Sequence, residues 1–268
     1  MKVRVLVGLI SVLMAPLARS ADWKLVWSDE FGAAKGRPPE PAKWAYDLGG
    51  GGWGNRELQR YSDDVRNVSH DGKGHLIIRV IRAPDGSFTS ARLKTQGKAA
   101  WEYGKIEARI KVPFGQGIWP AFWALGTDFS TAGWPKSGEI DVMENIGKEP
   151  STVHGTVHGP GYSGGAGISS QVTLRGNQRL ANGFHVFGVV WSQDSIEFFF
   201  DGRAYRRLTP AQLPQGATWA FNHPFFLLLN VAVGGEWPGN PDETTTFPQE
   251  MTVDWIRVWQ RAGSGSTR

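Results

Sequence analysis

At the centre of the 268-residue chain is the stretch Ser137-Gly138-Glu139-Ile140-Asp141-Val142-Met143-Glu144-Asn145, in which three carboxylates fall within six residues. Acidic residues alternate with apolar ones, which predicts a β-strand with one face in the core and the other face in a cleft. The period of two puts Glu139 and Asp141 on the same face of that strand.

Strict alternation would turn Glu144 towards the core, where a lone ionised carboxylate is very costly. One extra residue, a β-bulge at Val142-Met143, would return Glu144 to the cleft face. We therefore predict a row of three carboxylates on one surface of the protein.

Such a row suits the cleavage of a glycosidic bond, which needs one carboxylate and one carboxylic acid. Crowding three acidic groups raises the pKa of at least one, so that one can hold a proton near neutral pH while another is an anion. Two other interpretations stay open at this point. The acidic cluster could be a solvated edge strand, or it could bind Ca²⁺, which prefers oxygen ligands.

The remainder of the chain predicts an all-β fold. The clearest alternation runs from Tyr103 to Val112, with Ile106, Ala108 and Ile110 on one face and charged residues on the other. Other predicted strands are Trp23–Phe31, Leu76–Ile81, Phe184–Trp191, Ser195–Phe200, Phe225–Val231 and Met251–Trp259, and Pro210–Leu213 is the best candidate for a helical turn.

Many short strands separated by turn residues indicate a sandwich of two antiparallel sheets. A concave inner sheet would form a groove, with the acidic strand lying across it. No low-complexity linker or internal repeat is visible, so residues 21–268 are expected to form a single domain whose last few residues are a flexible tail.

Residues 1–20 resemble a secretory signal peptide: Lys2 and Arg4 precede an apolar run, and small residues stand at the cleavage position. The run is too short for a comfortable membrane span, so we expect a secreted protein, either extracellular or periplasmic. Removing Lys2, Arg4 and Arg19 lowers the formal charge from +4 to +1, which argues against a nucleic-acid partner. The chain has no cysteine, so an exported form has no disulfide bonds.

Three further segments are candidates for the lining of the cleft. Gly49–Gly52 precede Trp53-Gly54-Asn55-Arg56-Glu57-Leu58-Gln59, and a glycine run lets the backbone approach a ligand closely. Trp119 and Trp123 lie four residues apart, on one face of a strand, where indole rings can stack on sugars. His154 and His158 also share a face, and hydrogen bonding to a carboxylate or a sugar is more economical than a zinc site.

The segment Glu139-Ile140-Asp141-Val142-Met143-Glu144-Asn145-Ile146-Gly147-Lys148 resembles the active-site signature of glycoside hydrolase family 16. The extra Met143 before the last Glu resembles the laminarinase, or endo-β-1,3-glucanase, branch. The similarity extends over most of the chain beyond the signal peptide. It implies a β-jelly-roll sandwich with an open cleft and retaining hydrolysis of β-glucan by a monomer that needs no cofactor for catalysis.

The resemblance also implies roles for individual residues. Glu139 would be the nucleophile and Glu144 the general acid/base, with Asp141 orienting and tuning them. The residues implied to contact substrate are Asn55, Arg92, Trp119, Trp123, His158 and Trp237. A structural Ca²⁺ away from the catalytic centre would be held by the carboxylate of Asp254 and by backbone carbonyls near Glu30 and Gly74.

Two alternatives stay open within the same fold. One is activity on a galactan of the agarose or carrageenan type, and the other is a non-catalytic β-glucan-binding protein. Linkage preference, β-1,3 or mixed β-1,3-1,4, is open as well. Arg56 departs from the small or polar residue usual in the family, which leaves tolerance of anionic glucans undecided.

Overall fold

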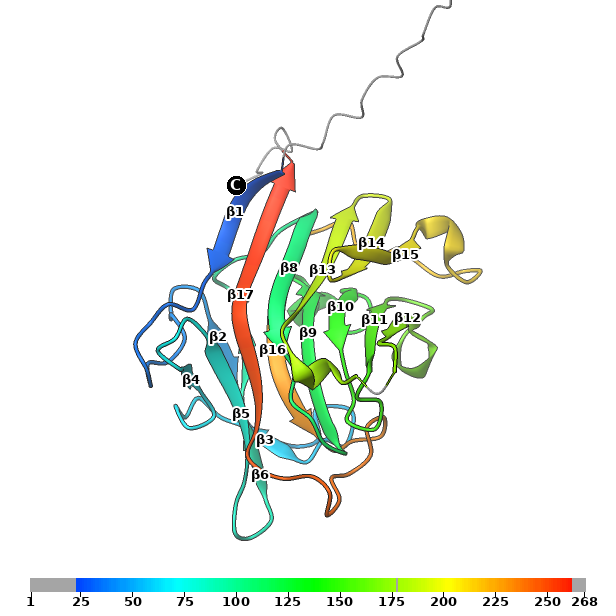
Figure 1. The fold of residues 1–268 in the computed structure, drawn as a ribbon. Helices are drawn as coiled ribbons and strands as arrows, with labels where there is room; N and C mark the ends of the chain where they lie inside the picture. The colour runs from blue at the N-terminus through cyan, green and yellow to red at the C-terminus, as the bar shows by residue number, and fades with distance from the viewer. Residues whose placement is uncertain (1–22, 177, 262–268) are drawn as a thin grey trace, which may run out of the picture.

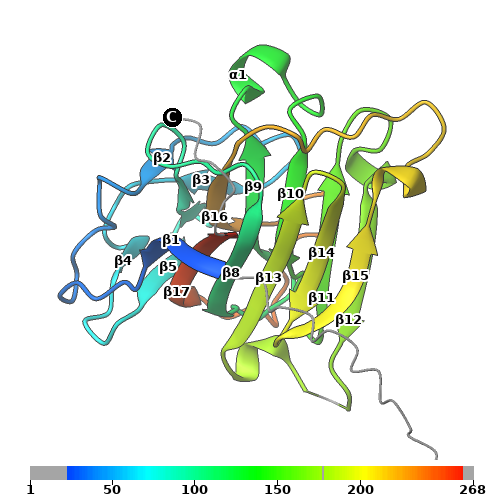
Figure 2. The ribbon, with the colours of Figure 1, turned by 90° about the horizontal axis from the view of Figure 1, so that it is seen from above.

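The computed structural model describes residues 23–176 and 178–261. The predicted signal peptide and the predicted C-terminal tail lie outside the described residues. The described chain forms two stacked β-sheets, and Figures 1 and 2 show them as layers seen from the front and from above. The predicted all-β sandwich is confirmed.

The first sheet has ten strands. In spatial order they are β15 (Arg203–Leu208), β14 (Ser195–Phe200), β13 (His185–Ser192), β8 (Gly104–Lys111), β17 (Gln249–Arg261), β5 (Leu76–Arg82), β6 (Phe88–Ser90) and β3 (Gln59–Tyr61), with β1 (Trp23–Asp29) paired to β17 and β4 (Val68–His70) paired to β5.

The second sheet has seven strands, and the acidic strand lies near its middle. The order is β12 (Ile168–Thr173), β11 (Thr152–His158), β10 (Glu139–Glu144), β9 (Ile118–Gly126), β16 (Phe225–Val233), β7 (Arg92–Lys94) and β2 (Ala45–Asp47). The short helical segments are α1 (Phe129–Ala132), η1 (Gly164–Ala166), η2 (Leu180–Asn182) and η3 (Pro210–Gln212).

The core lies between the sheets and follows the alternation of the sequence. Ile106, Ala108 and Ile110 of β8 are buried, whereas the charged residues between them are partly exposed. From the second sheet, Phe122 and Ile140 belong to the same apolar cluster. Burying each large apolar side chain contributes roughly 1.5–3 kcal/mol, so this layer fixes which face of β10 is turned towards the cleft.

Two features differ from the expected architecture. The pairing of β3 with β6 is parallel, although the two sheets were expected to be wholly antiparallel. The helical turn expected at Pro210–Leu213 is present as η3, but α1, η1 and η2 were not anticipated. Each of these helical segments is three or four residues long, too short to show a helical period in the sequence.

Candidate active site

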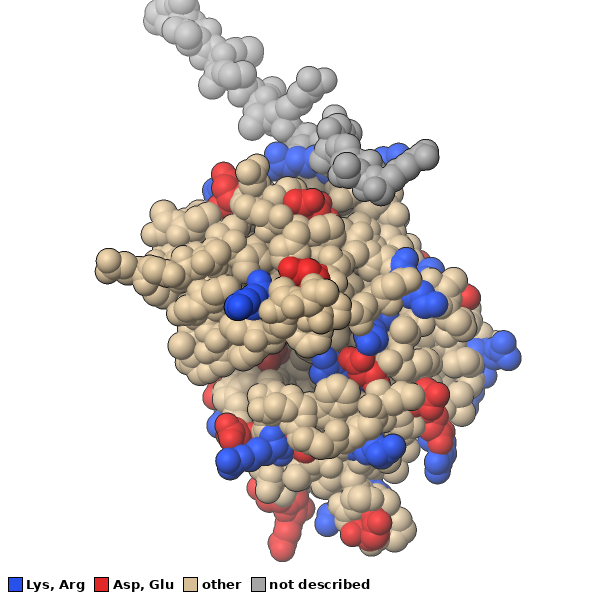
Figure 3. Space-filling view, turned by 180° about the vertical axis from the view of Figure 1, so that it is seen from behind, with Lys and Arg blue, Asp and Glu red and all other residues tan. Residues whose placement is uncertain are grey.

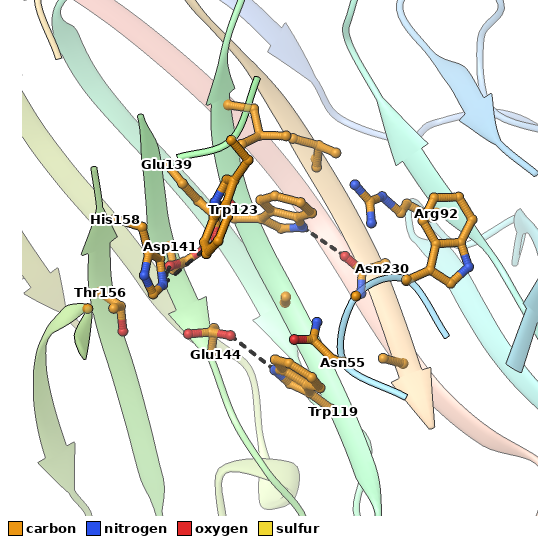
Figure 4. A pocket seen from close by; sticks show the side chains of 18 of the residues that line it. Asn55, Arg92, Trp119, Trp123, Glu139, Asp141, Glu144, Thr156, His158 and Asn230 are labelled. Atoms are coloured by element: carbon orange, nitrogen blue, oxygen red, sulfur yellow. Dashed lines mark hydrogen bonds and ion pairs between the residues drawn. The ribbon is translucent and has the colours of Figure 1, made fainter. Parts of the chain in front are cut away.

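A cavity of about 1100 Å³ lies on the outer face of the second sheet, the side opposite the core. The face seen from behind is hollowed near its centre (Figure 3), and Figure 4 shows side chains that line the cavity. All nine residues expected in the cleft contribute to its lining: Asn55, Arg92, Trp119, Trp123, Glu139, Asp141, Glu144, His158 and Trp237.

A β-bulge sets the direction of the last carboxylate. The register in which β10 pairs with β11 shifts between Asp141 and Glu144, and its register with β9 shifts between Asp141 and Met143. Val142 and Met143 are both buried in the apolar cluster, while Glu139, Asp141 and Glu144 all line the cavity. The predicted bulge and the predicted row of three carboxylates are both confirmed.

Each of the two glutamates accepts a hydrogen bond from an indole. Trp134 Nε1 donates to Glu139 Oε2 at 3.0 Å, and Trp119 Nε1 donates to Glu144 Oε1 at 3.1 Å. These bonds come from opposite ends of the acidic strand, as Figure 4 shows for Trp119 and Glu144. A different indole N–H group therefore orients each of the two carboxyl groups.

The third carboxylate, Asp141, lies between the glutamates and is in contact with a histidine. His158 pairs with Glu139 across β10 and β11, and its Nε2 lies 3.2 Å from Asp141 Oδ2 and 3.8 Å from Glu139 Oε1. Figure 4 shows this imidazole beside Asp141. A protonated His158 would favour the ionised form of both carboxylates.

Burial changes the acidity of all three groups. Removal from water, with repulsion by Asp141 second, raises the pKa of Glu139 from 4.5 to about 8. Removal from water also raises the pKa of Asp141 from 3.8 to about 7. The same cause, reinforced by the charges of Asp141 and Glu139, raises the pKa of Glu144 well above its usual value. The cluster therefore retains protons near neutral pH, and Glu144 is the group best suited to hold one.

Aromatic rings and an arginine line the cavity on the side of β7 and β9. The guanidinium of Arg92 lies 4.9 Å from the ring centroid of Trp53 and 4.7 Å from that of Trp123. Asp47 Oδ2 lies 2.9 Å from Arg92 Nε, and Asp47 Oδ1 lies 2.6 Å from Lys94 Nζ, so one carboxylate pairs with two cations. This arrangement combines flat aromatic surface, on which sugar rings can stack, with the cationic groups of Arg92 and Lys94.

The opposite end of the cavity is also aromatic. Trp237 meets Trp119 edge to face, with ring centroids 5.4 Å apart, and it contacts His154 at 5.0 Å in the same manner. Lys148 Nζ donates a hydrogen bond of 2.6 Å to the backbone carbonyl of Trp237. Trp237 therefore extends the apolar wall beyond Glu144.

The residues expected to hold Ca²⁺ lie outside this cavity. The carboxylate of Asp254 accepts a hydrogen bond from Arg109 and lies 4.0 Å from His75 Nε2. Arg109 takes Oδ2 of this carboxylate, which leaves Oδ1 for a Ca²⁺ ion, and that ion would stand beside a fixed positive charge. Glu30 forms a two-point ion pair with Arg257, at 2.9 and 2.8 Å.

The comparison with family models decides the classification. The model for "Glycosyl hydrolases family 16" matches residues 56–257, which include the acidic strand and most of both sheets. The chain belongs to glycosyl hydrolase family 16. Within this family, a β-glucanase from Rhodothermus marinus is 40% identical over 251 residues, covering 90% of this chain and 87% of the relative.

Solved structures of family 16 also match. The laminarinase catalytic domain from Thermotoga maritima is 46% identical with a TM-score of 0.84, covering 90% of this chain and 100% of that one. The endo-β-1,3-glucanase from Pyrococcus furiosus is 44% identical with a TM-score of 0.82, covering 90% and 95% of the two chains. The described fold is therefore the β-jelly roll of family 16 laminarinases.

Sequence reasoning missed several residues of the site. Trp134, five residues before Glu139, was not singled out although its indole bonds to that carboxylate. Glu57 and Asn230 also line the cavity, and neither was proposed as a site residue. The proximity of Trp134 to the acidic motif was a usable signal, whereas nothing in the local sequence marks Asn230.

Proposed function

We propose that the protein is an endo-acting β-1,3-glucanase that cleaves laminarin-type glucans with retention of anomeric configuration. The observation that carries this proposal is the pair Glu139 and Glu144 on one face of β10, each oriented by an indole N–H at the floor of an aromatic cavity. The double displacement requires only two carboxyl groups and water.

In the first step, the carboxylate of Glu139 attacks the anomeric carbon and forms a glycosyl ester. Glu144 donates its proton to the departing glycosidic oxygen, which its raised pKa equips it to do. In the second step, Glu144 removes a proton from water, and the water displaces Glu139 from the sugar. The ionised form of Glu139 is the one that attacks; a protonated His158, 3.8 Å away, favours that form, whereas the charge of Asp141 opposes it.

The shape of the cavity supports cleavage within a chain. Its lining runs from Asp47 on β2 to Ser169 on β12, and these strands are the two edges of the second sheet. A polysaccharide can therefore lie across the whole sheet with residues on both sides of the carboxylates. We assign Asn55, Arg92, Trp119, Trp123, His158 and Trp237 to contacts with this chain.

Four finer points are also proposals. Residues 1–20 direct export; among the described residues, no helix is long and apolar enough to cross a membrane. The protein acts as a monomer. Mixed-linkage β-1,3-1,4-glucan is a second substrate. A structural Ca²⁺ at Asp254 is disfavoured by the contact of that carboxylate with Arg109.

The test is a time course of products from laminarin, curdlan, lichenan and agarose with the purified protein. We expect mixed oligosaccharides to appear early from laminarin, with little product from agarose. Comparable products from lichenan would establish mixed-linkage activity. Cleavage of agarose alone would establish the galactan alternative, and binding of laminarin without new reducing ends would establish the binding-protein alternative.

A further inference from the structure

Glu57 is a partly buried carboxylate in the cavity that the proposed mechanism does not use. Its Oε1 accepts a hydrogen bond from Asn55 Nδ2 at 3.1 Å. Its Oε2 accepts from Gln59 Nε2 at 2.6 Å and from Tyr61 Oη at 3.4 Å. Three donors thus converge on one side chain at the base of the glycine-rich loop.

The orientation of Gln59 follows from a backbone contact. The N–H of Val233 donates to Gln59 Oε1 at 2.7 Å, and a backbone N–H has no capacity to accept. The carbonyl end of the Gln59 amide is therefore fixed at Val233, and the NH₂ end faces Glu57. Gln59 is buried, so water does not offer its amide group other hydrogen-bond partners.

The orientation of Tyr61 follows from a second donor-only group. Trp123 Nε1 donates to Asn230 Oδ1 at 2.8 Å, which leaves Asn230 Nδ2 to donate to Tyr61 Oη at 3.1 Å. The buried Tyr61 hydroxyl already accepts this bond, so its own hydrogen is directed to Glu57. Burial also raises the pKa of Tyr61 well above its usual value, which keeps that hydrogen in place.

Glu57 must therefore accept from both buried neighbours, and as a carboxylate it also accepts from Asn55. The amide of Asn55 consequently turns its NH₂ group to Glu57 and its carbonyl oxygen away from it. Asn55 is exposed and lines the cavity, and Figure 4 shows its side chain projecting there from the loop. The donor-only N–H groups of Trp123 and Val233 therefore fix the direction of every hydrogen bond in this chain, including the last one, from Asn55 to Glu57.

We propose that Glu57 is a positioning residue that makes Asn55 present a hydrogen-bond acceptor to the glucan, so that Asn55 recognises a sugar hydroxyl acting as donor. This inference rests on the proposed function, because it assumes that the cavity binds a glucan. A sugar should lose this contact when the hydroxyl that faces Asn55 is replaced by a group that cannot donate a hydrogen bond.

The loop itself does not depend on the side chain of Glu57. Backbone bonds close it, from Asn55 N to Gly52 O at 2.8 Å and from Glu57 N to Gly52 O at 3.0 Å. The N–H of Glu236 also donates to the carbonyl oxygen of Asn55 at 3.0 Å. A substitution of Glu57 that preserves its shape should therefore change the polarity of the contacts and leave the path of the backbone intact.

The test uses four variants: Glu57→Gln, Asn55→Asp, the double variant Asn55→Asp/Glu57→Gln, and Asn55→Ala. In Glu57→Gln the new carbonyl must face Gln59 and Tyr61, so the new NH₂ faces position 55 and the amide of Asn55 turns over. The cavity then receives a donor in place of an acceptor. In the double variant, the new carboxylate at position 55 accepts from that NH₂ and again offers an acceptor to the cavity.

We measure kcat and KM on laminarin, and the affinity for a β-1,3-linked glucose hexamer by calorimetry. Loss of one hydrogen bond predicts a KM and a dissociation constant about tenfold higher in Glu57→Gln and in Asn55→Ala, with kcat within about twofold of wild type. Asn55→Asp, with two carboxylates in contact, should bind at least as weakly. The double variant should return to within about threefold of wild type.

Rescue in the double variant is the decisive result, because a merely structural role for Glu57 would make the two substitutions additive. A double variant as weak as Glu57→Gln, or a Glu57→Gln protein equal to wild type, would overturn the inference. Failure of the proposed function looks different. Wild type that binds the hexamer without cleaving laminarin would overturn the enzyme and leave the affinity pattern to decide the inference, and wild type that does neither would overturn both.

Discussion

The acidic cluster should destabilise the folded protein at high pH, and Glu139→Gln should relieve that cost. The pKa of Glu139 rises from 4.5 to about 8 on folding, because burial and the neighbouring Asp141 oppose its charge. Below pH 4.5 the group is protonated in both the folded and the unfolded chain and costs nothing. Between pH 4.5 and 8 it is ionised in the unfolded chain but mostly protonated in the folded protein, so wild type loses stability as pH rises through this window.

The magnitude follows from the size of the rise. At about 1.36 kcal/mol for each pH unit, a rise from 4.5 to about 8 corresponds to at most about 5 kcal/mol. Because repulsion by Asp141 is part of the rise, Glu139 and Asp141 share this cost, and we take about 2 kcal/mol as the lower end. The amide of the variant retains the shape and can still accept the bond from Trp134. At roughly 2–4 °C for each kcal/mol, the variant should unfold at least about 4 °C above wild type at pH 8.5.

The assay is thermal unfolding followed by circular dichroism at several pH values from 4 to 9. We expect equal unfolding temperatures for wild type and Glu139→Gln near pH 4 and a gap that widens up to about pH 8. Glu243→Gln is the matched control, because Glu243 is an exposed carboxylate outside the cavity and should leave a small, constant difference. A gap that is constant with pH, or one that favours wild type at high pH, would refute the reasoning.

Three further predictions concern single contacts. Trp134→Phe removes the N–H that binds Glu139 and should lower kcat/KM on laminarin by roughly 10- to 100-fold, and unchanged kinetics would contradict the contact. Gly167→Ala would place a Cβ 2.4 Å from His158 Cε1 and should impair turnover. The control variant Gly165→Ala adds a Cβ with no atom within 4 Å and should leave turnover unchanged, so equal turnover in the two variants would contradict this prediction. A chelator should leave the unfolding temperature unchanged, because Arg109 already pairs with Asp254, and a fall reversed by Ca²⁺ would show that the site is used.

The parts of the fold that could be predicted are those that local patterning encodes. The period of β8 and the bulge in β10 both follow from which side chains tolerate burial, and each spans fewer than ten residues. Short strands such as β3 and β6 have three residues each, too few to show a period, and their parallel pairing depends on the sheets around them.

The parts of the site that escaped prediction depend on contacts between distant segments. Tyr61 and Asn230 are 169 residues apart in sequence, and no local feature of either segment shows that they meet. Glu57 stands in a polar loop where an exposed carboxylate would be unremarkable by pattern alone. Its role becomes visible only when the buried donors around it are identified. The acidic strand could be predicted because its three carboxylates fall within six residues of the sequence.

The most direct test of the central claim is to rescue nucleophile and acid/base variants with azide and to determine the configuration of the products. Purified Glu139→Ala and Glu144→Ala are incubated with an aryl β-laminaribioside and sodium azide, and products are analysed by NMR. If Glu139 is the nucleophile, azide in the Glu139→Ala variant attacks the anomeric carbon from the side opposite the leaving group and yields the α-glycosyl azide. If Glu144 is the acid/base, azide replaces water on the Glu139 ester and yields the β-glycosyl azide. The reverse assignment of anomers, or azide products from neither variant, would contradict the account.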